Sequence, residues 1–117
     1  MRAETIVSVP RVRRRTIADR LCDSVVALAR HQGHILSHKE IPWASITFAG
    51  ARHRIMLLFE GCPAIATGEE FIDALPEHEF TLPGQLVAEA QVVAVDHRLA
   101  PDARLIVTVE ILLLDDA

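Results

Sequence analysis

Three histidines and one carboxylate lie close together in the sequence and are the residues best suited to binding a metal. His31, His34 and His38 form an H-x2-H-x3-H pattern, and Glu40 follows as a fourth donor. Zinc favours ligands of these types. Gly33, however, is expected to end a helix between the first two histidines, so the rings need not share one face. A helix C-terminus also stabilises a histidine without metal. We therefore expect solvated histidines, with no metal and no other cofactor.

A second candidate for acid–base chemistry is a histidine between two acids. His78 lies between Glu77 and Glu79, which is an arrangement in which an imidazole can act as a general base. Pro76 and Pro83 bracket the segment as a loop, and loops often carry function. Side chains that are adjacent in sequence often point in different directions, so an exposed acidic turn is the expectation.

The two cysteines offer little to redox or nucleophilic chemistry. Cys62 follows Gly61 and would need a histidine, such as His53, His78 or His97, to approach it in the fold. Nothing in the sequence indicates such a meeting. Cys22 and Cys62 show no CxxC spacing, and we expect both to be reduced and buried.

Four arginines precede or open the first expected helix: Arg11, Arg13, Arg14 and Arg15. A helix N-terminus favours anions, so a phosphate or another small anion could bind there. Residues 1–58 carry ten basic and four acidic residues (+6), and residues 59–117 carry two and twelve (−10), which together give the net charge of −4. This asymmetry favours pairing between the two halves, within one chain or across a dimer. Nucleic acid is an unlikely partner for an acidic chain with few aromatic residues.

The hydrophobic pattern predicts four elements. A helix is expected over residues 16–32, because Thr16 and Asp19 form a capping pattern and apolar residues recur at helical spacing. Period-two alternation predicts a hairpin over residues 43–59 with its turn at residues 50–52. Thr67 and Glu70 indicate a helix of about two turns before residue 76. Residues 86–114 form a second hairpin, connected at residues 101–102.

This order, α-β-β-α-β-β, predicts a single α+β domain over residues 1–117. The expected architecture is a two-layer sandwich in which one long and one short helix cover an antiparallel sheet. Residues 1–9 are expected to form an arm or an edge strand. The last strand is apolar on both faces, for example at Ile106, Leu112 and Leu114. A second copy of the chain is the natural cover for its outer face, which predicts a homodimer.

Several functional classes lack their signatures here. The sequence contains no phosphate-binding loop, dinucleotide-binding glycine motif, serine hydrolase elbow or HExxH motif. No signal peptide or membrane-spanning run is evident, which predicts a soluble cytoplasmic protein without a membrane partner.

One stretch of the chain resembles a known family. The sequence LPGQLVAEAQVV at residues 82–93, followed by a second apolar strand, is similar to the strand pattern of hot-dog thioesterases and dehydratases. The resemblance implies a sheet wrapped around a long helix. It also implies acyl-thioester chemistry carried out by a polar residue such as Glu69, Asp73 or His78 at a dimer seam.

The sequence therefore favours a non-catalytic binding or assembly module that acts as a homodimer and takes a small apolar or anionic ligand. The hot-dog enzyme is one alternative. Anion or nucleic-acid binding through the basic N-terminal region is the other.

Overall fold

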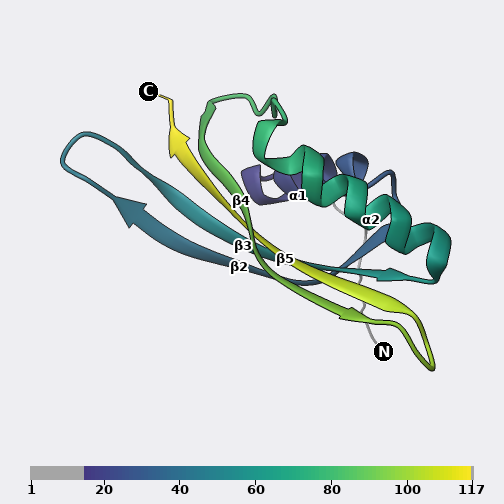
Figure 1. Ribbon diagram of the computed structural model, residues 1–117. Coiled ribbons are helices and arrows are strands. Elements are labelled where there is room, and N and C mark those ends of the chain that lie inside the picture. The colour runs from purple at the N-terminus through teal and green to yellow at the C-terminus, as the bar shows by residue number, and fades with distance from the viewer. Residues whose placement is uncertain (1–14, 117) are drawn as a thin grey trace, which may run out of the picture.

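Four antiparallel strands form one sheet, and two helices lie against one of its faces (Figure 1). The structure is a computed structural model and describes residues 15–116. The strand order across the sheet is β2-β3-β5-β4. The elements in chain order are α1 (Ile17–Leu28), β2 (Gly33–Ala44), β3 (Ala49–Glu60), α2 (Cys62–Ala74), the 3-10 turn η1 (Leu75–Glu77), β4 (Gln85–Arg98) and β5 (Arg104–Asp115). The α+β class and the order α-β-β-α-β-β are as predicted.

The core lies between the helices and the sheet. Leu21 and Val25 of α1 are fully buried, and Phe71 of α2 is 1% exposed. The strands contribute alternate residues of β3 and β5, which register places opposite each other on the face under the helices. These are Ile55, Leu57 and Phe59 on β3, with Leu105, Val107, Val109, Ile111 and Leu113 on β5.

The first helix is shorter than predicted. Thr16 is its N-cap and forms the expected capping box with Asp19. The helix ends at Leu28 instead of continuing to residue 32, and Arg30 and His31 adopt positive φ angles of 55° and 58° as the chain turns into the sheet. Gly33 begins β2 and is not the helix stop. A Cβ atom there would lie 2.8 Å from the Phe59 ring, so close packing explains the glycine.

The first hairpin is longer than predicted, because β2 begins ten residues before Trp43. Its turn lies at residues 45–48, where the Ser45 N–H donates to the Phe48 carbonyl at 2.7 Å. The prediction of a turn at residues 50–52 was wrong. Gly50 lies within β3, where a Cβ atom would be 2.0 Å from the Leu113 carbonyl oxygen.

The second helix is longer than predicted and starts earlier. It begins after the N-cap Gly61, with Pro63 in its first turn, and spans 13 residues against 12 in α1. The expectation of one long and one short helix was therefore wrong. Thr67 lies inside α2 and donates its hydroxyl to the Pro63 carbonyl at 3.3 Å. The N-cap residue is a glycine at φ 87°, a conformation that other residues rarely adopt.

The architecture fits the two-layer sandwich rather than the hot-dog alternative. Both helices lie on the same face of the sheet, and the sheet encloses neither of them (Figure 1). The β2–β3 hairpin extends beyond the helices at one end of the molecule, and the β4–β5 hairpin extends at the other. No helix within residues 15–116 has the length and apolar character needed to cross a membrane.

Candidate interaction surface and buried histidine pair

The arginines predicted to bind anions are represented in the structure by Arg15. Arg11, Arg13 and Arg14 lie outside the described residues. The Arg15 guanidinium forms an ion pair with the carboxylate of Asp23, which lies about two helical turns further along the chain in α1. It also donates to the Asp19 carbonyl at 3.4 Å. The guanidinium of Arg15 is thus engaged by its own helix.

The three clustered histidines do not converge. His31 is exposed in the turn after α1, and His34 is exposed at the start of β2. His38 is half-buried and lies on the face of β2 that the helices cover, because its register partner is the buried Ile55. Within residues 15–116, no group of three or more His, Cys, Asp or Glu side chains is placed to hold a metal ion.

His38 instead belongs to a hydrogen-bonded chain that links α1 to the sheet. The Cys22 Sγ atom lies 3.5 Å from His38 Nδ1, and His38 Nε2 lies 2.8 Å from Nδ1 of His53 on β3. The two imidazole rings stack with centroids 5.1 Å apart. His53 is only 2% exposed. Each of these two hydrogen bonds has one proton between its two heavy atoms. The tautomer of one histidine therefore determines which tautomer the other can adopt.

Two members of this chain, His53 and Cys22, have pKa values shifted in favour of their neutral forms. Burial lowers the pKa of His53, and His38 lowers it further, while Glu40 opposes the shift. Burial also raises the pKa of the Cys22 thiol, and Asp19 adds to this effect. A thiol with a raised pKa is a poor nucleophile, because the thiolate is the reactive form. Through its two contacts the chain links α1 to β2 and β3.

The second cysteine departs from expectation. Cys62 is exposed at the start of α2, so the prediction that both thiols are buried was wrong for this residue. The thiol that does meet a histidine is Cys22, which sequence reasoning had not connected with His38 or His53. Sixteen and fifteen residues separate the successive members of this chain, and no local pattern marks the contact.

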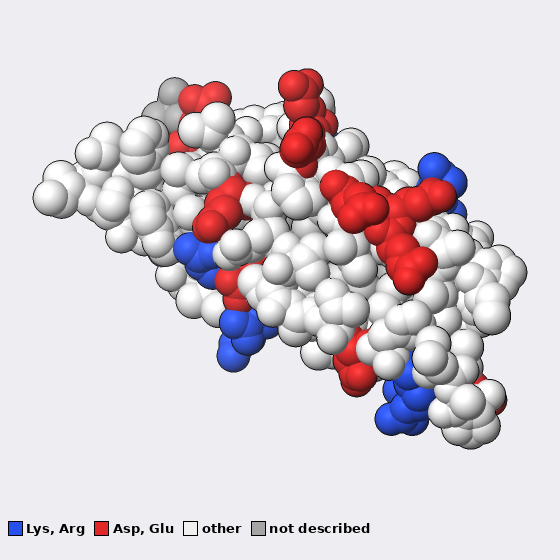
Figure 2. All heavy atoms as spheres, in the orientation of Figure 1, with Lys and Arg blue, Asp and Glu red and all other residues white. Residues whose placement is uncertain are grey.

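His78 lies in the exposed turn that the two prolines indicated. Its ring packs edge-on against Phe80, with centroids 4.6 Å apart. Glu77 and Glu79 are exposed beside it. Figure 2 shows acidic side chains clustered over α2. Most of the basic side chains visible in that view lie toward the sheet, and one group lies beside the acidic cluster.

The sheet face opposite the helices, which we call the open face, has an apolar end. Register places Trp43, Gly50, Leu114 and Leu86 in one row across the four strands. The next row contains Ile41, Arg52, Leu112 and Glu89. Ile41 is 38% exposed and Leu86 is 52% exposed. The helices do not cover this face, but Leu112 and Leu114 of the central strand β5 are only 7% and 6% exposed, so the apolar side chains that meet solvent are those of the edge strands.

Ion pairs cross the centre of the open face. Arg54 Nε donates to Glu110 Oε2 at 2.8 Å. Arg52 Nη1 lies 3.2 Å from Glu89 Oε1 and 3.7 Å from Glu110 Oε1. Two cations of β3 thus bracket a carboxylate of β5, and these pairs link three strands. In this network, arginines of the basic half of the sequence form ion pairs with glutamates of the acidic half.

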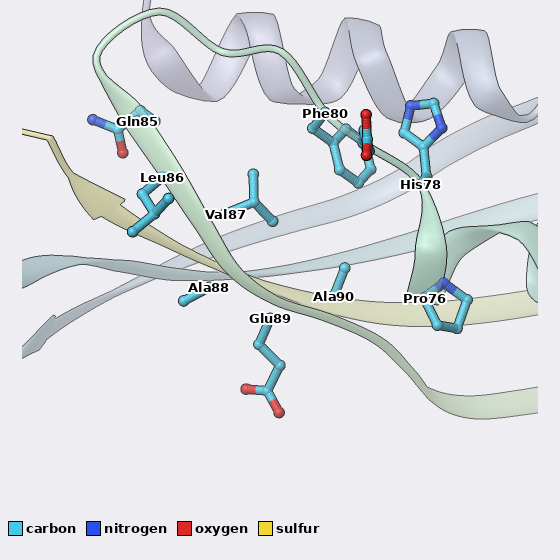
Figure 3. A pocket seen from close by; sticks show the side chains of 10 residues that line it. Pro76, His78, Phe80, Gln85, Leu86, Val87, Ala88, Glu89 and Ala90 are labelled. Atoms are coloured by element: carbon cyan, nitrogen blue, oxygen red, sulfur yellow. The ribbon is translucent and has the colours of Figure 1, made fainter.

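A groove lies along the outer edge of β4. Residues 85–90 face the segment containing Pro76, His78 and Phe80 across a cavity of about 350 Å³ (Figure 3). A smaller cavity of about 180 Å³ lies beside the start of α1 and is lined by Ile17, His53 and Gln85 among others. Gln85 lines both cavities.

Comparison with known proteins gives one structural similarity. Neither the protein-family models nor the curated proteins contain a match. Among solved structures, the fold is similar to that of a chain from the virion of a native gene transfer agent particle. The two share 17% sequence identity, with a TM-score of 0.53, over 85% of this chain and 91% of that chain. At this identity the likeness shows a common fold.

Proposed function

We propose that this protein is a non-catalytic assembly module that pairs with a second copy of itself through the open face of its sheet. The apolar end of that face carries the argument, because Ile41 and Leu86 are 38% and 52% exposed there, on a surface that neither α1 nor α2 covers. Burying apolar area stabilises association by about 25 cal/mol per Å² before entropic costs.

The size of the molecule is compatible with this interface. A standard interface removes about 800 Å² from each partner. The surface of this chain measures 7527 Å². Roughly a tenth of it would therefore be covered, which one end of a four-stranded sheet can supply. An interface between identical patches is closed by a two-fold axis, so the apolar rows of the two copies would face each other.

The structural neighbour supports an assembly role rather than a particular activity. That chain belongs to the virion of a native gene transfer agent particle. We infer that the present chain likewise serves as a structural subunit of a larger protein assembly. The hydrogen-bonded chain of Cys22, His38 and His53, which links α1 to the sheet, supports a structural role.

Light scattering at micromolar concentration tests the proposal. The wild-type protein is expected at twice 12.9 kDa. Leu86→Glu places a charge at the apolar end of the open face, opposite Leu114, and should weaken association at least about tenfold, since burying an unpaired charge costs several kcal/mol. Val95→Glu is the matched control, because Val95 is also an exposed edge-strand residue (50%) but shares the face of Val107. A wild-type monomer, or equal effects of both variants, would refute the proposal.

A further inference from the structure

The end of the β2–β3 hairpin, residues 44–49, projects beyond the rest of the sheet, and we call it the hairpin tip. The pairing of β3 with β5 stops at Gly50, opposite Leu114. The tip is therefore a two-stranded ribbon with no further strand beside it among residues 15–116, and neither helix reaches it (Figure 1). All six of its residues are exposed.

The hairpin tip is apolar and uncharged. Ile46 is fully exposed, more than any other large apolar residue within residues 15–116, and Phe48 is 46% exposed. Residues 41–51 include no acidic or basic residue, and Glu40 and Arg52 bound this uncharged stretch. In Figure 2 the projecting end of the molecule is white on the face that the view shows. Large apolar side chains exposed together at one uncharged end indicate a contact surface.

Hydrogen bonds within the turn prepare this surface for burial. The Ser45 hydroxyl accepts from the N–H groups of Thr47 and Phe48 at 3.3 and 3.0 Å. The Ser45 N–H donates to the Phe48 carbonyl at 2.7 Å. These N–H groups therefore keep their partners when water is excluded from the tip, which avoids the cost of an unpaired donor. The turn is also fixed before a partner binds, and this lowers the entropic cost of association.

The proposed dimer needs exposed apolar surface, and the open face alone supplies little of it. Leu112 and Leu114 are only 7% and 6% exposed, and Ile41 and Leu86 are 38% and 52% exposed. Ile41 and Leu86 together expose less than one complete side chain, whereas Ile46 alone exposes a whole one. Since apolar association depends on the apolar area removed from water, the tip offers more than the end of the open face that it adjoins.

We propose that the hairpin tip of one copy packs against the hairpin tip of a second copy, so that the dimer interface extends from the open face over the end of the hairpin. This inference rests on the proposed self-association and names the segment that carries it. The tip directly follows Ile41 and Trp43 of the open face along β2.

The charge distribution favours contact between identical tips. A two-fold axis places a surface patch against its own copy, so charges within the patch meet like charges and repel. The acidic cluster over α2 would suffer this repulsion (Figure 2). The uncharged hairpin tip avoids it.

A lipid bilayer is the other class of partner that takes an exposed apolar hairpin, and the charges of this hairpin disfavour it. Arg52 Nη1 lies 3.2 Å from Glu89 Oε1, and Arg54 Nε donates to Glu110 Oε2 at 2.8 Å. Both guanidinium groups are thus engaged within the sheet rather than held ready for anionic headgroups. The net charge of −4 also opposes approach to an anionic surface.

Light scattering over a concentration series tests the tip contact. Ile46→Asp should raise the dissociation constant of the dimer about tenfold or more, because it places two carboxylates together in the contact. Leu99→Asp is the matched control and should leave the constant unchanged. Leu99 is also an exposed apolar residue (75%) but belongs to the β4–β5 hairpin at the opposite end of the molecule. Equal Tm values for the two variants exclude an effect through folding.

Disulfide crosslinking locates the contact independently. In a Cys62→Ser background, Ile46→Cys should give a covalent dimer with a mild thiol oxidant, and Leu99→Cys should not. If Leu86→Glu weakens association but Ile46→Asp does not, the open-face dimer stands and the tip contact is wrong. A wild-type monomer at micromolar concentration refutes both proposals. Wild-type binding to vesicles of phosphatidylcholine and phosphatidylglycerol that is lost in Ile46→Asp would overturn the tip contact in favour of lipid.

Discussion

Gly68 of α2 lies in close contact with the sheet. Replacing it with alanine has two opposing effects on the stability of the protein, overpacking and a gain in helix propensity. A Cβ atom at this position would lie 2.8 Å from Leu105 Cδ2 and 2.9 Å from Phe59 Cγ and Cδ1. Ordinary carbon–carbon contacts are about 3.5–4.0 Å, and overpacking of this kind costs about 1–3 kcal/mol. Leu105 and Phe59 are 1% and 0% exposed and cannot move aside into solvent. Alanine recovers about 1 kcal/mol of helix propensity.

The overpacking term is the larger one, so Gly68→Ala should destabilise the protein by about 1 kcal/mol, a fall in Tm of roughly 4 °C. Thermal and urea unfolding measure this difference. Ala66→Gly at an exposed position of α2 gives the propensity term separately, and it too should cost about 1 kcal/mol. If Gly68→Ala raised the Tm, α2 would not pack against Phe59 as closely as described, and the reasoning would be wrong.

Further predictions concern the buried histidine, the thiols, the basic region and metal. Because the folded-state pKa of His53 is lowered, the unfolded chain binds a proton first as pH falls through about 6.5. The stability contributed by neutral His53 is therefore full above that pH and is lost below it, toward the lowered pKa. Melting curves from about pH 7.5 to about pH 5.5 should show this loss, and a His53→Gln variant should show less of it; identical slopes would contradict the assignment. Iodoacetamide should label Cys62 before Cys22, and the reverse order would contradict the burial described. Replacing Arg11, Arg13, Arg14 and Arg15 with Gln should leave duplex DNA binding weak at physiological salt; submicromolar wild-type binding with a steep salt dependence would favour a nucleic-acid protein. Elemental analysis should find no stoichiometric zinc, and an equivalent lost in His34→Ala would show otherwise.

The sequence predicts the elements better than their boundaries. Period-two alternation located the β4–β5 hairpin, and the Thr16 capping pattern located the start of α1. The segment at residues 33–42 was missed as a strand because its polar residues face solvent on an edge and a bulge near Leu36 breaks the alternation. Gly33 and Gly50 are typical turn residues, yet both stand where a neighbouring group approaches too closely for a Cβ atom. Close approach between distant segments leaves no trace in local sequence.

The candidate surfaces depended on pairing that sequence does not specify. The two-sided apolar character of β5 could be read directly, and it indicated an uncovered face. The partners of Arg52 and Arg54 could not be identified, because Glu89 and Glu110 lie 37 and 56 residues away along the chain. The Cys22–His38–His53 chain could not be predicted either, because its members are also far apart in the sequence. The charge composition predicted that the two halves of the sequence attract each other. The strand register determines which charged residues form the ion pairs.

The central position of β5 has a consequence for biosynthesis. β5 lies between β3 and β4 although it is the last of these strands in the chain. The β2–β3 hairpin can form as soon as residue 60 has been synthesised. The backbone groups on the other edge of β3 then have no strand partner until residues 104–115 have been synthesised. Ribosomes add about 5–20 residues per second, so this interval lasts seconds. During that time the nascent chain presents an unpaired apolar strand, which is the kind of surface that chaperones recognise and that aggregates in their absence. Synthesis rate and chaperone supply should therefore influence the yield of this protein more than they influence its final stability.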